Sequence, residues 1–329
     1  MATRSGDPAK AGDESRVLVG GNFLDALSED DRARLFAVGR TRTVEPGEEV
    51  ARQGSRGDSL FVLTEGELAV LRSLPGDQEK LLFRAKPGTV LGEIAVLDRG
   101  ARSASLKATR RSTLREVALG AFEGVALYGG ESGCRILRAV AASVHERLEA
   151  TRRIAGVPRA AKAPGGALRW TAASPGALAV LGQIAAFEGL AARDWSAMLP
   201  RVSVAYVPRG ADLSLPESPG AVIVLRGALS PWDESGPEVS VPVAGPGAFV
   251  DCAAALGLAS EHLVAEPRRW RARSPTRLLR LDPALFAPGS EFSSRLLYAL
   301  SRSLATTLRR TTGLAMHLRM AWVRPAAPA

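Results

Sequence analysis

Residues 91–105 read LGEIAVLDRGARSAS, and this stretch decides how the chain around it is interpreted. It contains a Gly-Glu pair at 92–93, an apolar run at 94–97 and an Arg-Ser-Ala triplet at 102–104. A carboxylate accepts hydrogen bonds from hydroxyls, a guanidinium pairs with anionic oxygens, and the first N–H groups of a short helix attract anions. Together these groups are complementary to a small molecule that carries both hydroxyls and an anionic group.

Short β-rich runs surround this stretch. Residues 41–118 contain TRTVEPGEEV, DSLFVLTEGELAVLRSL, KLLFRAKPGTVLGE and SASLKATRRSTLREV. Glycines separate the runs where tight turns need a positive φ, at Gly47, Gly54, Gly57, Gly66 and Gly88. Several short strands at this spacing predict a sandwich or a β-roll.

Helical patterns stand on both sides of the strands. From Phe23, the sequence FLDALSEDDRARLFAVG predicts a helix with Ser28 as its N-cap and one apolar face, formed by Leu24, Leu27, Leu35 and Val38. Residues 131–153 carry a second amphipathic stripe, formed by Leu137, Ala141, Val144 and Leu148. The first half therefore reads as helix, β-roll, helix.

The same order of patterns recurs in the second half. Residues 175–202 resemble the first helical lead-in, and residues 221–227 (AVIVLRG) resemble residues 60–66 (LFVLTEG). A closing helix is expected over residues 292–320, with a stripe of Leu297, Leu300, Leu304 and Leu308. A repeat this long predicts two domains rather than a solenoid.

The predicted fold class is α+β, mainly β, with two tandem jelly-roll-like β-rolls that are each flanked by helices. We expect a disordered N-terminus, a first domain, a Pro- and Gly-containing linker, a second domain and a tail, at residues 1–20, 21–153, 154–174, 175–320 and 321–329.

Set in this frame, residues 92–104 resemble the phosphate-binding cassette of cyclic nucleotide-binding domains. The resemblance rests on GEIAVL, on the nine-residue step from Glu93 to Arg102, on the RSA triplet and on the β-roll frame. The layout is similar to the regulatory subunits of cyclic nucleotide-dependent kinases. Each half resembles the sensory domain of the catabolite activator protein family. We refer to residues 92–104 as the cassette.

The resemblance implies a role for each part of the cassette. Gly92 allows close backbone approach, Glu93 accepts from the ribose 2′-hydroxyl, and the short helix at 94–97 turns its N–H groups to the phosphate. Arg102 pairs with the phosphate, and Ser103 contacts phosphate or base. The expected ligand-binding residues are Gly92, Glu93, Ile94, Ala95, Arg102, Ser103 and Ala104.

Two observations weaken this interpretation. A surface ion pair between Glu93 and Arg102 would explain both charges without any ligand. The family commonly has proline before the arginine, whereas this chain has Ala101, which leaves the loop more mobile.

The second half lacks these groups. Aligning Pro246-Gly247 with Pro87-Gly88 places Asp251 opposite Gly92 and Cys252 opposite Glu93, and Glu266 falls at the position of the arginine. We therefore expect the second roll to be degenerate, with a structural role.

Composition excludes several other classes of protein. The chain has 329 residues, a net charge of +9 and a pI of about 10.3, which indicates an anionic partner or a general surplus of arginine. Two distant cysteines and three isolated histidines provide no zinc or other metal site. Since no catalytic motif is present, we expect no enzyme, no catalytic residues and no cofactor apart from the ligand. Without a signal peptide or a long apolar run, we expect a cytoplasmic protein with no membrane span.

The sequence thus predicts a non-enzymatic sensor that binds a cyclic nucleotide in its first domain and signals to a protein partner. Family frequency favours cAMP over cGMP. A scaffold with ligand-free rolls is one alternative. The segment after Glu291 has no acidic residue and carries Arg295, Arg302, Arg309, Arg310, Arg319 and Arg324, so a nucleic acid-binding regulator is another, although no helix-turn-helix follows either roll. The leucine stripes fit a homodimer and intramolecular packing equally well.

Overall fold

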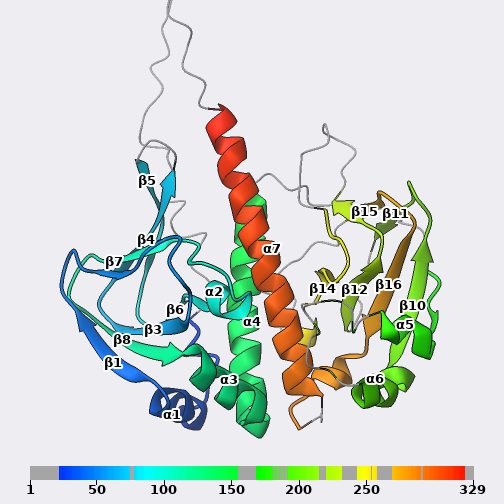
Figure 1. The fold of residues 1–329 in the computed structure, drawn as a ribbon, viewed down its shortest axis with the longest axis horizontal. Coiled ribbons are helices and arrows are strands. Elements are labelled where there is room, and N and C mark those ends of the chain that lie inside the picture. The colour runs from blue at the N-terminus through cyan, green and yellow to red at the C-terminus, as the bar shows by residue number, and fades with distance from the viewer. Residues whose placement is uncertain are drawn as a thin grey trace, which may run out of the picture.

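Two β-rolls stand on either side of a central pair of long helices in the computed structural model (Figure 1). The structure describes residues 22–74, 78–154, 168–180, 182, 184, 187, 190, 192–214, 220–231, 243–252, 254–257, 269–289 and 292–322. The N-terminal segment expected to be disordered and most of the expected linker lie outside these residues, as does nearly all of the expected tail.

The first half contains the predicted β-roll. Its strands are β1 (Arg40–Val44), β2 (Glu49–Ala51), β3 (Ser59–Glu65), β4 (Leu68–Leu74), β5 (Gln78–Ala85), β6 (Val90–Leu91), β7 (Ser105–Ala108) and β8 (Ser112–Ala118). They form two antiparallel sheets, in the orders β1-β8-β3-β6 and β2-β7-β4-β5. Alternate side chains point inward and bury a cluster between the sheets that includes Phe61, Leu68 and Phe83.

The helices of the first half are α1 (Glu29–Ala37), α2 (Glu93–Leu97), α3 (Leu119–Tyr128) and α4 (Gly130–Ile154). The Ser28 cap is confirmed, because its hydroxyl accepts from the backbone N–H of Asp31 at 3.2 Å. The expected helical start at Phe23 is wrong. Residues 23–27 form turns that bury Phe23 and Leu27, and Val38 is 41% exposed.

The second half repeats the strand order of the first. Its elements are β9 (Thr171–Ala172), α5 (Pro175–Ala179), α6 (Ala192–Met198), β10 (Val202–Val207), β11 (Asp212–Ser214), β12 (Ala221–Arg226), β13 (Leu229–Pro231), β14 (Phe249–Asp251), β15 (Arg269–Ala272), β16 (Thr276–Leu281) and α7 (Ser293–Trp322), with 3₁₀ turns at Leu199–Arg201, Ala254–Leu256 and Pro283–Phe286. The sheets run β14-β12-β16-β10-β9 and β11-β15-β13. The sheet β14-β12-β16-β10-β9 has one strand more than its counterpart in the first half. This extra strand is β9, which lies at the end of the expected linker and pairs with β10.

Helices α4 and α7 are counterparts of one another. Arg135 at the start of α4 binds Asp31 at 2.8 Å, and Arg295, 160 positions later at the start of α7, binds Asp194 at the same distance. At the same offset, Cys134 and Ser294 contact each other at 3.3 Å. Because equivalent residues of the two helices meet at this point, the two halves are related by an approximate two-fold rotation about the helix crossing.

The main core lies between the halves. Leucines of both stripes are buried in one continuous cluster with side chains of both rolls, among them Leu137, Leu148, Leu297, Leu304 and Leu308. The leucine stripes are therefore used for packing within the chain. Among the described helices, none is both long and apolar enough to cross a bilayer.

Candidate functional site

The cassette begins at a sharp turn after β6. Gly92 has a φ of 77°, in the left-handed region that glycine tolerates, and it precedes the predicted short helix, which is present as α2. A Cβ atom at Gly92 would lie 2.4 Å from Nη1 of Arg102. The turn therefore needs glycine both for its backbone angle and for the space that the arginine occupies.

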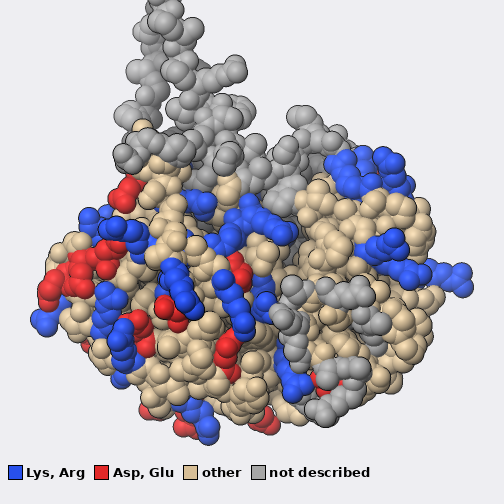
Figure 2. All heavy atoms as spheres, viewed as in Figure 1, with Lys and Arg blue, Asp and Glu red and all other residues tan. Residues whose placement is uncertain are grey.

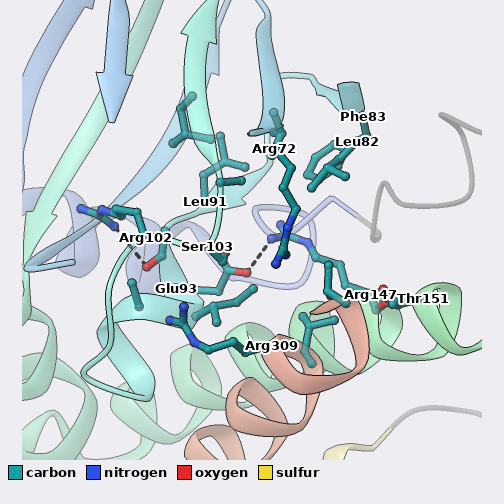
Figure 3. A pocket seen from close by; sticks show the side chains of 18 residues that line it. Arg72, Leu82, Phe83, Leu91, Glu93, Arg102, Ser103, Arg147, Thr151 and Arg309 are labelled. Atoms are coloured by element: carbon teal, nitrogen blue, oxygen red, sulfur yellow. Dashed lines mark hydrogen bonds and ion pairs between the residues drawn. The ribbon is translucent and has the colours of Figure 1, made fainter. Parts of the chain in front are cut away.

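A cavity opens between the cassette, the β4–β5 hairpin and the two central helices (Figure 3). All seven residues expected from the sequence line it: Gly92, Glu93, Ile94, Ala95, Arg102, Ser103 and Ala104. The hairpin side of the cavity is mainly apolar, with Val70, Leu82 and Phe83. The structure thus gathers the expected residues at one end of a single cavity and places an apolar wall at the other.

Glu93 is the most deeply buried charge of the site, at 1% exposure. Its Oε1 accepts from Nη1 of Arg147 in α4 at 2.5 Å, and the same guanidinium donates to the carbonyl of Val90. The other carboxylate oxygen, Oε2, has no hydrogen-bond partner among the described residues. A buried acceptor without a partner is costly, so Oε2 is an acceptor left open to a group that enters the cavity.

Arg102 is also buried, but it turns away from the cavity towards β3. Its Nη1 donates to the carbonyl of Ser59 at 2.6 Å and to that of Gly92 at 3.3 Å, and its Nη2 donates to the Ser59 hydroxyl at 3.0 Å. Burial lowers the pKa of this guanidinium, and the charge of Asp58 acts in the opposite direction. The alternative of a Glu93–Arg102 surface ion pair is wrong, since both groups are buried and each has other partners.

Several lining residues were not found from the sequence. They are Arg72 of β4, Arg147 and Thr151 of α4, and Leu308, Arg309 and Thr312 of α7. The sequence predicts a helix over residues 131–153, and the four-residue spacing of Arg147 and Thr151 is the signal that could have placed both on one face of it. No local signal connects α7 to the first roll, because that contact spans some 200 positions of sequence.

Two arginines of the last helix form ion pairs with other elements of the chain. Arg309 forms a two-fold hydrogen-bonded ion pair with Asp98 at the end of α2, and Arg295 pairs with Asp194. The side chain of Arg295 is nevertheless 42% exposed, so nucleic acid binding by this segment stays a prediction.

The counterpart position in the second roll has lost the polar pair of the first. Cys252, opposite Glu93, is buried 3.7 Å from Nδ1 of His145, and Thr307 lies at the α7 position that corresponds to Arg147. Trp270 stands where the first roll has Leu106 and fills part of the interior. Glu266 lies outside the described residues. At these positions the second roll thus lacks both the carboxylate of Glu93 and the arginine that binds it.

A family model described as the cyclic nucleotide-binding domain matches residues 41–127. Residues 41–127 form a cyclic nucleotide-binding domain. This domain contains the complete cassette and the strands that frame it. Within the described part of the chain, no cluster of three or more His, Cys, Asp or Glu side chains is arranged to hold a metal ion.

Curated relatives match the chain around this domain. The cGMP-dependent protein kinase egl-4 of Caenorhabditis elegans is 36% identical over 87 residues, which are 26% of this chain and 10% of the kinase. The Cyclic AMP receptor protein of Thermus thermophilus is 34% identical over 97 residues, 30% of this chain and 45% of that protein. A cAMP-dependent protein kinase regulatory subunit of Mycosarcoma maydis is 30% identical over 93 residues, 28% of this chain and 18% of the subunit. The matches cover less than half of each relative.

Among solved structures, the regulatory domain of Toxoplasma gondii PKA with cAMP aligns with 86% of this chain and 92% of its own, at 17% identity and a TM-score of 0.30. The N-terminal domain of a transcriptional regulator from Streptomyces coelicolor aligns with 40% of this chain and 93% of its own, at 28% identity and a TM-score of 0.34.

Proposed function

We propose that this chain is a non-enzymatic cyclic nucleotide sensor that binds one cAMP molecule in its first roll and passes the signal to a protein partner in the cytoplasm. One observation carries the proposal: the unpartnered Oε2 of Glu93, buried in the cavity next to the start of α2. A ribose hydroxyl would satisfy this oxygen, and the nearby helix N-terminus suits the cyclic phosphate.

The proposed pose follows the long direction of the cavity. The phosphate lies at the start of α2 near Arg102, and the ribose lies at Glu93. The base then extends towards Leu82, Phe83 and Thr151, on the far side of Glu93 from Arg102 (Figure 3). In this pose Arg102 exchanges its hydrogen bonds to Ser59 for stronger, charge-assisted bonds to the phosphate.

The choice of cAMP is supported by Thr151. Its hydroxyl donates to the carbonyl of Arg147 at 2.8 Å, so it presents accepting lone pairs to the cavity. An acceptor complements the 6-amino group of adenine and opposes the 6-oxo group of guanine. The relatives include proteins named for cAMP and one named for cGMP, so their names do not decide between the two nucleotides. The Thr151 hydroxyl supports cAMP, which family frequency also favours.

The proposed transmission route runs through both central helices. Glu93 connects the cassette to α4 through Arg147. Two contacts connect the cassette to α7. One is the ion pair of Asp98 with Arg309, and the other is a series of hydrogen bonds in which Arg99 and Tyr298 both donate to Glu123. A ligand that binds one arrangement of the cassette more tightly would shift the position of both helices, and with them the second roll.

The second roll supplies the proposed partner surface. Residues 154–329 hold 19 of the 43 Lys and Arg residues but only 12 of the 34 Asp and Glu residues. In Figure 2 acidic side chains lie mainly over the first roll, and basic ones gather where this roll meets the central helices and over the second roll. An acidic protein surface suits this excess of positive charge.

Isothermal titration with cAMP and, separately, cGMP tests the proposal. We expect one site per chain, with tighter binding of cAMP. Arg102→Ala should lower the affinity about tenfold or more, because it removes a charge-assisted pair with the phosphate. Circular dichroism of the variant checks that the fold is kept. Failure of the parent to bind either nucleotide would instead support a scaffold with ligand-free rolls.

A further inference from the structure

Arg72 is a cation of the cavity wall that forms no ion pair with any carboxylate of the described residues. It extends from β4 into the cavity beside Leu82 and Phe83 of β5 (Figure 3). None of the described residues forms an ion pair or a hydrogen bond with its guanidinium. By contrast, Arg147 and Arg309, which line the same cavity, each bind a carboxylate.

The charges around Arg72 make its position unfavourable in the ligand-free protein. Lys80 lies directly opposite Arg72 in the β4–β5 pairing, so two positive charges face each other across the hairpin. Burial lowers the pKa of Arg72, and the positive charge of Arg309 lowers it further. A half-buried cation with positive neighbours gains free energy only when an electron-rich group enters the cavity.

The position of Arg72 indicates which part of a bound nucleotide would lie next to its guanidinium. Arg102 and the start of α2 form the phosphate end, and Glu93 occupies the middle. Arg72 comes from the opposite wall, at the end where the base is placed (Figure 3). Guanidinium groups bind electron-rich aromatic rings through cation–π attraction, and purines offer such a face.

We propose that Arg72 contacts the purine base of the bound nucleotide and helps to set the affinity for it. This assignment rests on the proposed function of the cavity. It gives β4 a role in base recognition that the cassette motif does not contain.

The test compares Arg72→Gln with Lys80→Gln by displacement of a fluorescent cyclic nucleotide. Lys80 is the matched control, because it shares the face and charge of Arg72 but does not line the cavity. The competitors are cAMP, the base-free ribose 3′,5′-cyclic phosphate, and adenosine. For Arg72→Gln we expect about a three- to thirtyfold loss with cAMP and adenosine and no comparable loss with the base-free ligand. Lys80→Gln should change all three affinities little.

Thermal melting provides a second readout. Because Arg72 has no partner to lose among the described residues, ligand-free Arg72→Gln should melt at the temperature of the parent or higher, which a merely structural residue would not do. If Arg72→Gln lost as much affinity for the base-free ligand as for cAMP, Arg72 would contact the phosphate and not the base, and the assignment would be overturned. Unchanged cAMP affinity in Arg72→Gln would overturn it as well. If the parent bound none of the three ligands, the proposed function would fail and the assignment with it.

Discussion

Gly92 holds the turn into the cassette at a backbone angle that a side chain resists. Replacing it with alanine adds a Cβ atom both at a φ of 77° and 2.4 Å from Nη1 of Arg102. We expect Gly92→Ala to lower the free energy of unfolding by about 1–3 kcal/mol and to displace Arg102. Urea denaturation measures the first effect, and titration with cyclic nucleotide measures the second.

Gly120→Ala is the matched control for this substitution. Gly120 lies in α3 with an ordinary φ, and nothing stands within 4 Å of an added Cβ. Its replacement should leave stability unchanged or raise it by up to about 1 kcal/mol. Equal effects of the two substitutions would contradict the steric argument for Gly92.

At this scale the sequence identified one end of the cavity but not the other. The cassette is continuous in sequence, so its spacing alone allowed all seven expected residues to be named together, although their contact with a ligand stays a prediction. Arg72 and Thr312 come from elements whose position depends on the packing of the whole chain. Nothing in their local sequence distinguishes them from surface residues.

At the scale of elements, α3 and α7 are joined by a buried phenol. Tyr298 of α7 is 8% exposed and donates to Glu123 of α3 at 2.5 Å. Burial, followed by the hydrogen bond to the Glu123 carboxylate, raises the pKa of Tyr298 from 10.0 to about 12. Since the folded pKa is raised, the contact stabilises the fold fully below pH 10 and is lost as the pH rises towards 12.

Spectrophotometric titration of phenolate tests this contact. The absorbance of the parent should keep rising up to about pH 12, and Tyr298→Phe should remove this last step. Tyr128→Phe is the control, because Tyr128 is 83% exposed and makes no such contact with the described residues. Loss of the step in the control, or its persistence in Tyr298→Phe, would contradict the assignment.

The β-strands were easier to predict than the helices. Alternating runs between glycine turns gave the first roll, and this prediction is confirmed by its two sheets. Helix α3 was missed because Gly120 and Gly124 give its sequence a poor helical propensity, which burial of Phe122 and Ala126 outweighs. The early start predicted for α1 failed because turns can bury apolar side chains at helical spacing as well.

On the scale of the whole molecule, the shared core predicts that the two halves unfold together. Leu304 is 1% exposed within the cluster that includes side chains of both rolls. We expect Leu304→Ala to lower the free energy of unfolding by about 2–5 kcal/mol and to leave a single calorimetric transition. Val38→Ala, at a side chain that is 41% exposed, should change stability by less than about 0.5 kcal/mol. Two separated transitions in the parent would show that the halves are independent.

The repeat of the two halves was visible in the sequence, but their arrangement was not. The stripes on residues 131–153 and 292–320 fitted either a homodimer or internal packing, since both bury the same leucines. The contact between Cys134 and Ser294 shows that the stripes meet within one chain.

Covalent connection of the two halves has a consequence for dose response. In a homodimer of single-roll subunits, dilution would separate the two central helices, and any substitution would be present in both subunits. Here the contact of α4 with α7 lies within one chain, so its effective concentration is fixed by the chain, and each roll can acquire a substitution that the other lacks. With the one site per chain proposed above, occupancy would follow the ligand concentration with a Hill coefficient of one, and dilution of the protein would not change it.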